Sequence, residues 1–194
     1  THNLLFYQEL LLACAECSPQ VSVLKCMIQK SAKSFGLVSV KDEPWVAKKV
    51  KDRMAALTTQ LEKMPNDLVS GSEKLRAIAK EFYTNLRETW ERTVEEIVLG
   101  GVVERFGSNV ETMKLGYVAF DDDDYRIIFF AMKKASELTG HDTPMAKQID
   151  APNKASMEED LRTLRKFKET YKKKSEEHYK SRKLLQNPPA AQVS

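Results

Sequence analysis

An arginine and a glutamate, Arg87 and Glu91, lie four positions apart in the middle of a long amphipathic segment. On an α-helix this spacing places both side chains on one face, where they can form an ion pair. An arginine can also bind a phosphate bidentately, and a glutamate can transfer a proton. The two residues are therefore either a surface ion pair beside Trp90 or part of a polar functional site.

The segment that positions this pair is predicted to be a helix from Glu73 to Leu99. Its apolar residues recur at spacings of three and four, as an amphipathic helix requires: Leu75, Ile78, Ala79, Phe82, Leu86, Trp90, Val94, Ile97 and Val98. Gly100 and Gly101 are expected to end it, because glycine suits the C-cap of a helix. The pattern places Trp90 in the core and the Arg87–Glu91 pair beside it.

Two other clusters have residue types that bind metals, but neither has the spacing of a metal site. Cys14 and Cys17 form a CxxC inside an apolar helical run with no second cysteine pair. Asp121 to Asp124 lack the glycine and the spaced ligands of a calcium loop. We interpret the aspartates as the start of a helix, where negative charge is favourable, and the cysteines as reduced thiols.

Length and composition predict a helix-rich protein without a membrane span. The 194 residues are 42% hydrophobic and 30% charged, enough for one sizeable domain or a domain with an appendage. No apolar run approaches the roughly 20 residues that cross a bilayer, and no targeting segment is evident, so we expect a cytoplasmic protein. The chain opens at Thr1 without a methionine, which indicates a piece of a longer polypeptide.

The remaining pattern is helical apart from a short stretch near the N-terminus. A nearly continuous apolar helix, buried on most sides, is predicted from Leu4 to Ala15. The segments 21–28 and 35–40 have β-type composition and predict a hairpin or an added sheet edge. Further helices are predicted after Pro44, after the aspartates and from Ser156 to about Leu185. The last carries a thin apolar stripe, Leu161, Leu164, Phe167 and Tyr171.

That last helix is also basic. Between Lys154 and Lys183 eleven lysines and arginines stand against six acidic residues. Such a surface is either simply solvated or contacts a phosphate backbone.

Two stretches resemble SMC/ABC-like ATPases of prokaryotic antiviral defence. Thr1-His2-Asn3-Leu4, followed by Phe6 and an apolar helix, resembles the switch-histidine strand end of ABC/SMC-type ATPases. The second resembles the C-terminal region of the large ATPases grouped with the anticodon nucleases PrrC and RloC; it comprises Leu86 to Arg92, Val94-Glu95-Glu96, Leu99, Gly101-Val102-Val103 and Arg105-Phe106. Pro44-Trp45-Val46 and Gly140-His141-Asp142 extend the resemblance to about Lys183.

The resemblance implies a mainly α fold, in which a helical domain follows the last strand and helix of an ABC-type ATPase head, with a short β-hairpin near the N-terminus. Its parts would be the end of the head at 1–42, a helical effector or appendage domain at 43–150, a basic C-terminal helix at 151–186 and a disordered tail at 187–194. His2 would sense the γ-phosphate of ATP, held with Mg²⁺ in the full-length protein. This chain has no GxxxxGK[ST] loop, so alone it is expected to bind no cofactor.

The resemblance also implies self-association through the ATPase heads and a metal-independent RNase that cuts tRNA, with Arg87, Glu91 and His141 as its catalytic set. The histidine or glutamate would take the proton of a ribose 2′-hydroxyl and return one to the leaving 5′-oxygen. The arginine would stabilise the developing charge on the phosphate. Arg92 and Glu96 form an equally spaced alternative pair, and His141 is alternatively a turn residue.

The alternative function is a non-catalytic helical appendage that mediates dimerisation, recruits a separate effector subunit or binds DNA. The two functions differ in geometry. A nuclease needs its arginine, glutamate and histidine at one open cleft, whereas an appendage does not.

Overall fold

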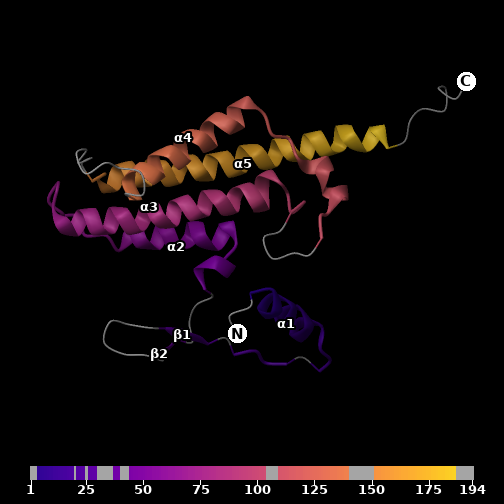
Figure 1. Cartoon of the computed structure of the whole chain (residues 1–194), viewed down its shortest axis with the longest axis horizontal. Helices are drawn as coiled ribbons and strands as arrows, with labels where there is room; N and C mark the ends of the chain where they lie inside the picture. The colour runs from indigo at the N-terminus through magenta and orange to yellow at the C-terminus, as the bar shows by residue number, and fades with distance from the viewer. Residues whose placement is uncertain are drawn as a thin grey trace, which may run out of the picture. The chain divides into compact units, whose positions relative to one another are not determined.

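The computed structural model describes residues 4–19, 21–24, 26–29, 37–39, 44–103, 109–139 and 151–186. These residues are mainly helical, which confirms the predicted fold class at that level (Figure 1). They form two compact units, one before Val50 and one from Val50 onward. The domain limits expected at 42 and 150 remain predictions, and the tail at 187–194 lies outside the described residues.

The N-terminal unit contains helix α1 (Leu4–Glu16), strands β1 (Met27–Gln29) and β2 (Leu37–Ser39), and the short 3₁₀ helix η1 (Trp45–Ala47). The two strands pair antiparallel, with Ile28 opposite Val38. They are three residues each, far shorter than the segments expected from the sequence, and residues 21–24 have no strand structure. That this unit is the end of an ATPase head remains a prediction.

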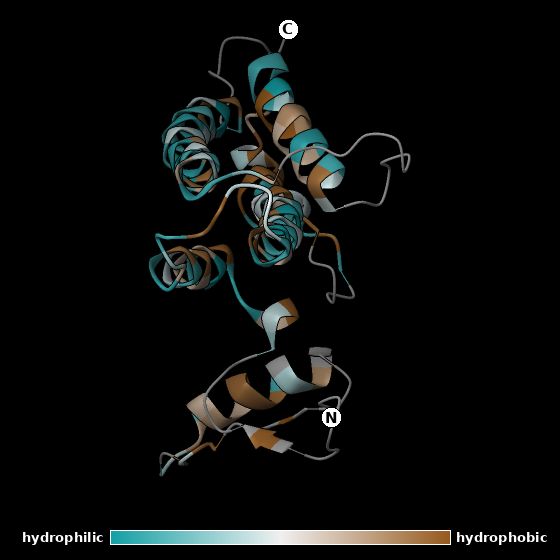
Figure 2. Cartoon of the chain, turned by 90° about the vertical axis from the view of Figure 1, so that its left-hand side faces the viewer, coloured by the Kyte–Doolittle hydropathy of each residue, from teal (hydrophilic) through white to brown (hydrophobic). Residues whose placement is uncertain are grey.

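Helix α1 is less buried than its apolar sequence predicts. Figure 2 shows the hydrophobic character of the N-terminal unit, yet Phe6, Leu10 and Leu12 are 56%, 48% and 60% exposed. The prediction of a helix buried on most sides is therefore wrong for this chain. An apolar run is compatible with a helix, but it does not determine whether another part of the protein covers that helix.

The C-terminal unit is built from four long helices that lie side by side, α2 (Val50–Glu62), α3 (Glu73–Thr93), α4 (Asp122–Thr139) and α5 (Lys154–Leu185). Helix α3 contacts each of the other three (Figure 1). A π-helical turn, η2 (Val94–Val98), continues α3, and a 3₁₀ helix, η3 (Thr112–Tyr117), precedes α4.

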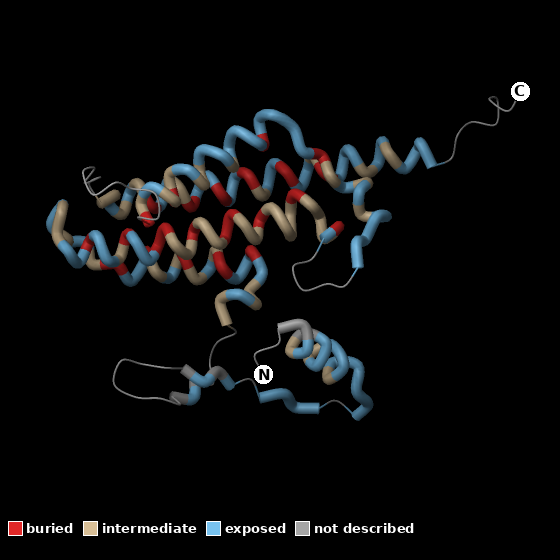
Figure 3. Tube along the Cα trace, viewed as in Figure 1, coloured by how far each residue is buried: buried red, intermediate tan, exposed pale blue. Residues whose placement is uncertain are grey.

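The core of this unit lies between α2, α3 and α5. Figure 3 shows the buried positions concentrated along these helices, whereas α4 is mostly exposed. Trp90 is 1% exposed, and its ring centroid lies 5.3 Å from that of Phe167. The stripes predicted on α3 and α5 are confirmed at their largest members, namely Phe82, Leu86, Trp90, Leu161, Leu164, Phe167 and Tyr171.

The ends of α3 follow from local chemistry. The Ser72 hydroxyl accepts a hydrogen bond from the Leu75 amide at 3.2 Å, which caps the first turn. At the other end the predicted helix to Leu99 is an α-helix followed by the π-helical turn. Gly100 and Gly101, with φ of 56° and 75°, then end it as expected.

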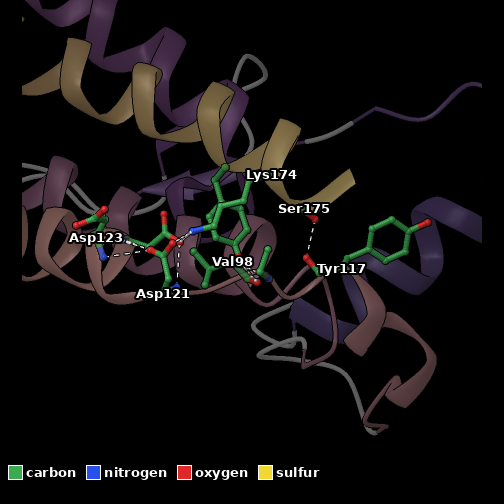
Figure 4. Close-up of polar contacts among 9 residues, drawn as sticks. Val98, Tyr117, Asp121, Asp123, Lys174 and Ser175 are labelled. Atoms are coloured by element: carbon green, nitrogen blue, oxygen red, sulfur yellow. Dashed lines mark hydrogen bonds and ion pairs between the residues drawn. The ribbon is translucent and has the colours of Figure 1, made fainter. Parts of the chain in front are cut away.

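Helix α5 holds the segment that leads into α4. The buried Tyr171 hydroxyl donates to the Val98 carbonyl at 3.0 Å and accepts from the Ala119 amide at 2.9 Å. The Ser175 hydroxyl donates to the Tyr117 carbonyl at 2.6 Å (Figure 4). One helix therefore satisfies backbone groups at Val98, Tyr117 and Ala119, which flank or belong to the segment that leads into α4.

The same face of α5 also pairs with the aspartates at the start of α4. Lys174 forms ion pairs with Asp121 and Asp124 (Figure 4). Asp121 Oδ1 accepts the amide hydrogen bonds of Asp123 at 3.1 Å and Asp124 at 3.0 Å, which confirms the predicted helix capping.

Replacing Tyr171 with phenylalanine tests the importance of its hydroxyl. Tyr171→Phe leaves the Ala119 amide and the Val98 carbonyl without this buried partner, so we expect the free energy of unfolding to fall by about 1–3 kcal/mol. Tyr125→Phe, which removes a hydroxyl from an exposed ring, is the matched control and should change stability by less than about 0.5 kcal/mol. Equal effects in urea denaturation would contradict this role for Tyr171.

The Lys174–Asp121 contact also predicts a pH dependence. The hydrogen bond from Lys174 lowers the pKa of Asp121 from 3.8 to about 2. Because the unfolded chain binds this proton more readily, the stability contributed by the contact is present above pH 4 and lost as pH falls from about 4 to 2. In Lys174→Met the pKa of Asp121 should return toward its ordinary value, measured by carboxyl NMR titration. An unchanged pKa in Lys174→Met, with Lys173→Met as control, would contradict the assignment.

Candidate functional site

Arg87 and Glu91 form the ion pair that their spacing predicts. The Arg87 Nη2 and Glu91 Oε1 atoms are 3.4 Å apart, and the two side chains are 38% and 34% exposed. The Arg87 Nε is buried and has no hydrogen-bond partner among the described residues. This N–H group is one of the five donors of the Arg87 guanidinium.

The histidines expected to complete the ATPase and RNase sites, His2 and His141, lie outside the described residues. The structure thus brings together two of the three residues of the predicted catalytic set, and the position of the third remains a prediction. The one other histidine of the chain, His178, is exposed on α5.

The alternative pair, Arg92 and Glu96, has a structural role instead. Arg92 pairs with Glu95 at 3.1 Å and with Glu96 at 3.5 Å. Glu96 Oε2 also accepts a hydrogen bond from the Val50 amide at 3.0 Å. Val50 begins α2, and its amide is one of the first-turn donors without a partner inside the helix. A carboxylate is favourable there because of the helix macrodipole.

The turn that carries Arg87 and Glu91 is held from the side of α2. Arg53 is 3% exposed, and its Nη1 donates to the Glu88 carbonyl at 2.8 Å. Trp90 packs in the core on another side of α3. The α3 backbone around Arg87 and Glu91 is therefore held by contacts on two sides. Sequence periodicity could not identify this contact. Arg53 is charged, so the pattern of α2 places it at the surface, and its partner is a backbone carbonyl of α3.

A cavity of about 350 Å³ opens between α3, α4 and α5. Its walls are mostly apolar and include Leu86, Trp90, Ile127 and Phe130, while Arg126, Lys134 and Asp160 are its charged residues. Arg87 and Glu91 are not among the lining residues, although their chain neighbours Leu86 and Trp90 are. The cavity and the ion pair therefore lie on different faces of α3, because sequence neighbours on a helix point in different directions.

The polar end of this cavity is already paired within the protein. The Tyr83 hydroxyl donates to Asp160 Oδ2 at 2.5 Å, and Lys134 Nζ lies 2.7 Å from the same carboxylate oxygen. Burial, reinforced by Asp160, raises the pKa of Tyr83 far above its ordinary value, so the phenol stays protonated. These groups stabilise the packing of α3, α4 and α5. The surface of the cavity that remains for a ligand is mainly apolar.

Within the described ranges no group of three or more histidine, cysteine, aspartate or glutamate side chains is placed to hold a metal ion. No helix in that part of the chain is long and apolar enough to cross a membrane.

The chain matches no protein-family model, no curated protein and no solved structure.

The different roles of Glu91 and Glu96 can be separated by the same conservative change. Glu96→Gln removes the charge that pairs with Arg92 and caps α2, so the free energy of unfolding should fall by about 1–2 kcal/mol. Glu91→Gln breaks a partly exposed ion pair within one helix and should cost no more than about 0.5 kcal/mol. Chemical denaturation of both variants measures the difference. A larger loss for Glu91→Gln than for Glu96→Gln would reverse the two roles.

Proposed function

We propose that this chain is the C-terminal part of an SMC/ABC-like ATPase of prokaryotic antiviral defence, and that its helical unit is a metal-independent RNase that cuts tRNA. The observation that supports the proposal best is the Arg87–Glu91 pair. Its guanidinium and carboxylate are 3.4 Å apart, and about a third of each side chain is exposed. A phosphodiester can therefore reach both groups while the helix that carries them stays folded.

Each residue of the proposed site has a distinct task. Arg87 would hold the scissile phosphate through two N–H groups and stabilise its developing negative charge. Glu91 would accept the proton of the ribose 2′-hydroxyl as the 2′-oxygen attacks phosphorus. His141 would donate a proton to the 5′-oxygen as the bond from phosphorus to that oxygen breaks. The products are a 2′,3′-cyclic phosphate and a 5′-hydroxyl.

The proposed control of this activity by ATP rests on the Thr1-His2-Asn3-Leu4 motif. ATP with Mg²⁺ would drive the association of two ATPase heads in the full-length protein, and His2 would sense the γ-phosphate. The sequence has no phosphate-binding loop, so in this proposal another part of the full-length protein would hold the nucleotide.

A non-catalytic appendage that recruits a separate effector subunit or DNA is the second candidate function. The observation in its favour is the exposure of Tyr125, Phe129 and Phe130 on α4, at 56%, 45% and 62%. Aromatic side chains at a surface are typical of binding interfaces and have no task in the proposed cleavage. In this case Arg87 and Glu91 only stabilise α3.

The two candidates are separated by tRNA cleavage assays on the full-length protein. Glu91→Gln and His141→Ala should each lower the cleavage rate by about 100-fold or more, as expected for loss of a general acid or base. Arg87→Lys keeps the charge but loses the bidentate contact and should also reduce cleavage. Glu81→Gln, an exposed glutamate on the same helix, is the matched control and should cleave normally.

Toxicity on expression in cells gives a second readout. If tRNA cleavage and toxicity are unchanged in both Glu91→Gln and His141→Ala, the RNase proposal is wrong and the appendage is favoured.

A further inference from the structure

Helix α4 carries a row of side chains that stay exposed although α4 packs beside α3 and α5. Its members are all exposed and follow one another at spacings of one, three and four, so that they form one face over about three turns: Asp122, Tyr125, Arg126, Phe129, Phe130 and Lys133. Figure 3 shows how exposed α4 is compared with α3 and α5. We call these six residues the α4 stripe.

The aromatic members of the α4 stripe contact each other, and Phe130 also lines the cavity between α3, α4 and α5. The ring centroids of Tyr125 and Phe129 are 5.8 Å apart, and those of Phe129 and Phe130 are 5.4 Å apart. This cluster exists before any partner binds, so little side-chain entropy is lost when it is covered. Three neighbouring exposed rings on one helix indicate an interaction surface.

The order of charges along the α4 stripe indicates what covers it. An acidic residue, Asp122, lies at the N-terminal end, and a basic residue, Lys133, lies at the other. Positions 122 and 133 are equally far from the midpoint between Ile127 and Ile128, and so are positions 126 and 129. In an antiparallel pair of α4 helices centred on this midpoint, position 122 of one copy lies opposite position 133 of the other. The stripe is therefore complementary to itself when a second copy runs in the opposite direction.

We propose that two copies of this chain associate through α4, with the two helices antiparallel and a two-fold axis between Ile127 and Ile128. Asp122 then faces Lys133 of the second copy, and Arg126 faces the ring of Phe129 of the second copy. Two-fold symmetry makes each contact twice. The first contact pairs opposite charges, and the second is a cation–π interaction.

The size of this surface sets the strength of the association. One helix from each copy buries less surface than a standard stable interface, which buries about 1,200 Å² or more. Dimerisation of the isolated chain is therefore reversible and depends on protein concentration. In a longer protein whose heads also associate, the same contact would form at a much higher effective concentration. The dimer is independent of whether Arg87 and Glu91 cleave RNA.

Charge exchange across the interface tests the orientation of the two helices. By sedimentation equilibrium of the chain, Asp122→Lys alone and Lys133→Asp alone should each weaken the dimer by at least about 10-fold, because each creates two contacts between like charges. An equimolar mixture of the two variants should dimerise like the unaltered chain, since both contacts again join opposite charges. Phe129→Asp should be monomeric, alone and in the mixture.

Lys173→Asp, an exposed charge reversal on α5, is the matched control and should dimerise normally. Circular dichroism and thermal unfolding show whether each variant keeps its helices. A monomeric unaltered chain at concentrations of several hundred micromolar, or a mixture that dimerises no better than the single variants, would overturn the inference. Either result leaves tRNA cleavage unaffected, so the RNase proposal is judged by its own assay.

Discussion

The hydroxyl of Tyr171 connects three parts of the C-terminal unit that are far apart in the chain. It is 1% exposed, donates to the carbonyl that ends the π-helical turn and accepts from the amide of Ala119. Ser175 and Arg182 extend this contact along α5 by donating to the carbonyls of Tyr117 and Val118. Because α4 begins directly after this segment, the anchoring by α5 determines where α4 starts. Both the cavity and the α4 stripe depend on that position.

A second set of contacts determines the surroundings of the Arg87–Glu91 pair. Glu96 caps the start of α2, and Arg53 from α2 binds the carbonyl of Glu88. The charged residues around the pair are thus occupied in joining helices, whereas Arg87 and Glu91 contact each other at a partly open surface. This difference in burial, rather than their spacing, separates the proposed site from the alternative pair at Arg92 and Glu96.

The features that the sequence predicted correctly depend on neighbours in the chain. The periodicity of α3 and α5 identified Trp90 and Tyr171 as core residues, the glycines ended the helical run, and Asp121 capped α4. The features it missed depend on which helices meet. Arg53 is buried because a carbonyl of α3 faces it, and the cavity lies where α3, α4 and α5 meet. Periodicity likewise could not show that Phe6 on α1 is exposed, because the pattern within one helix does not say which other element packs against it.

If the proposed RNase site is correct, a phosphodiester binds where Arg87 and Glu91 meet, and His141 reaches the same place. The most direct measurement is a crystal structure of the chain with a short anticodon-loop RNA whose 2′-hydroxyl at the cleavage position is replaced by hydrogen. We expect a phosphate oxygen within about 3 Å of the Arg87 guanidinium, with the His141 imidazole within hydrogen-bond reach of the 5′-oxygen. A histidine more than about 10 Å from the pair, with no phosphate at Arg87, would contradict it.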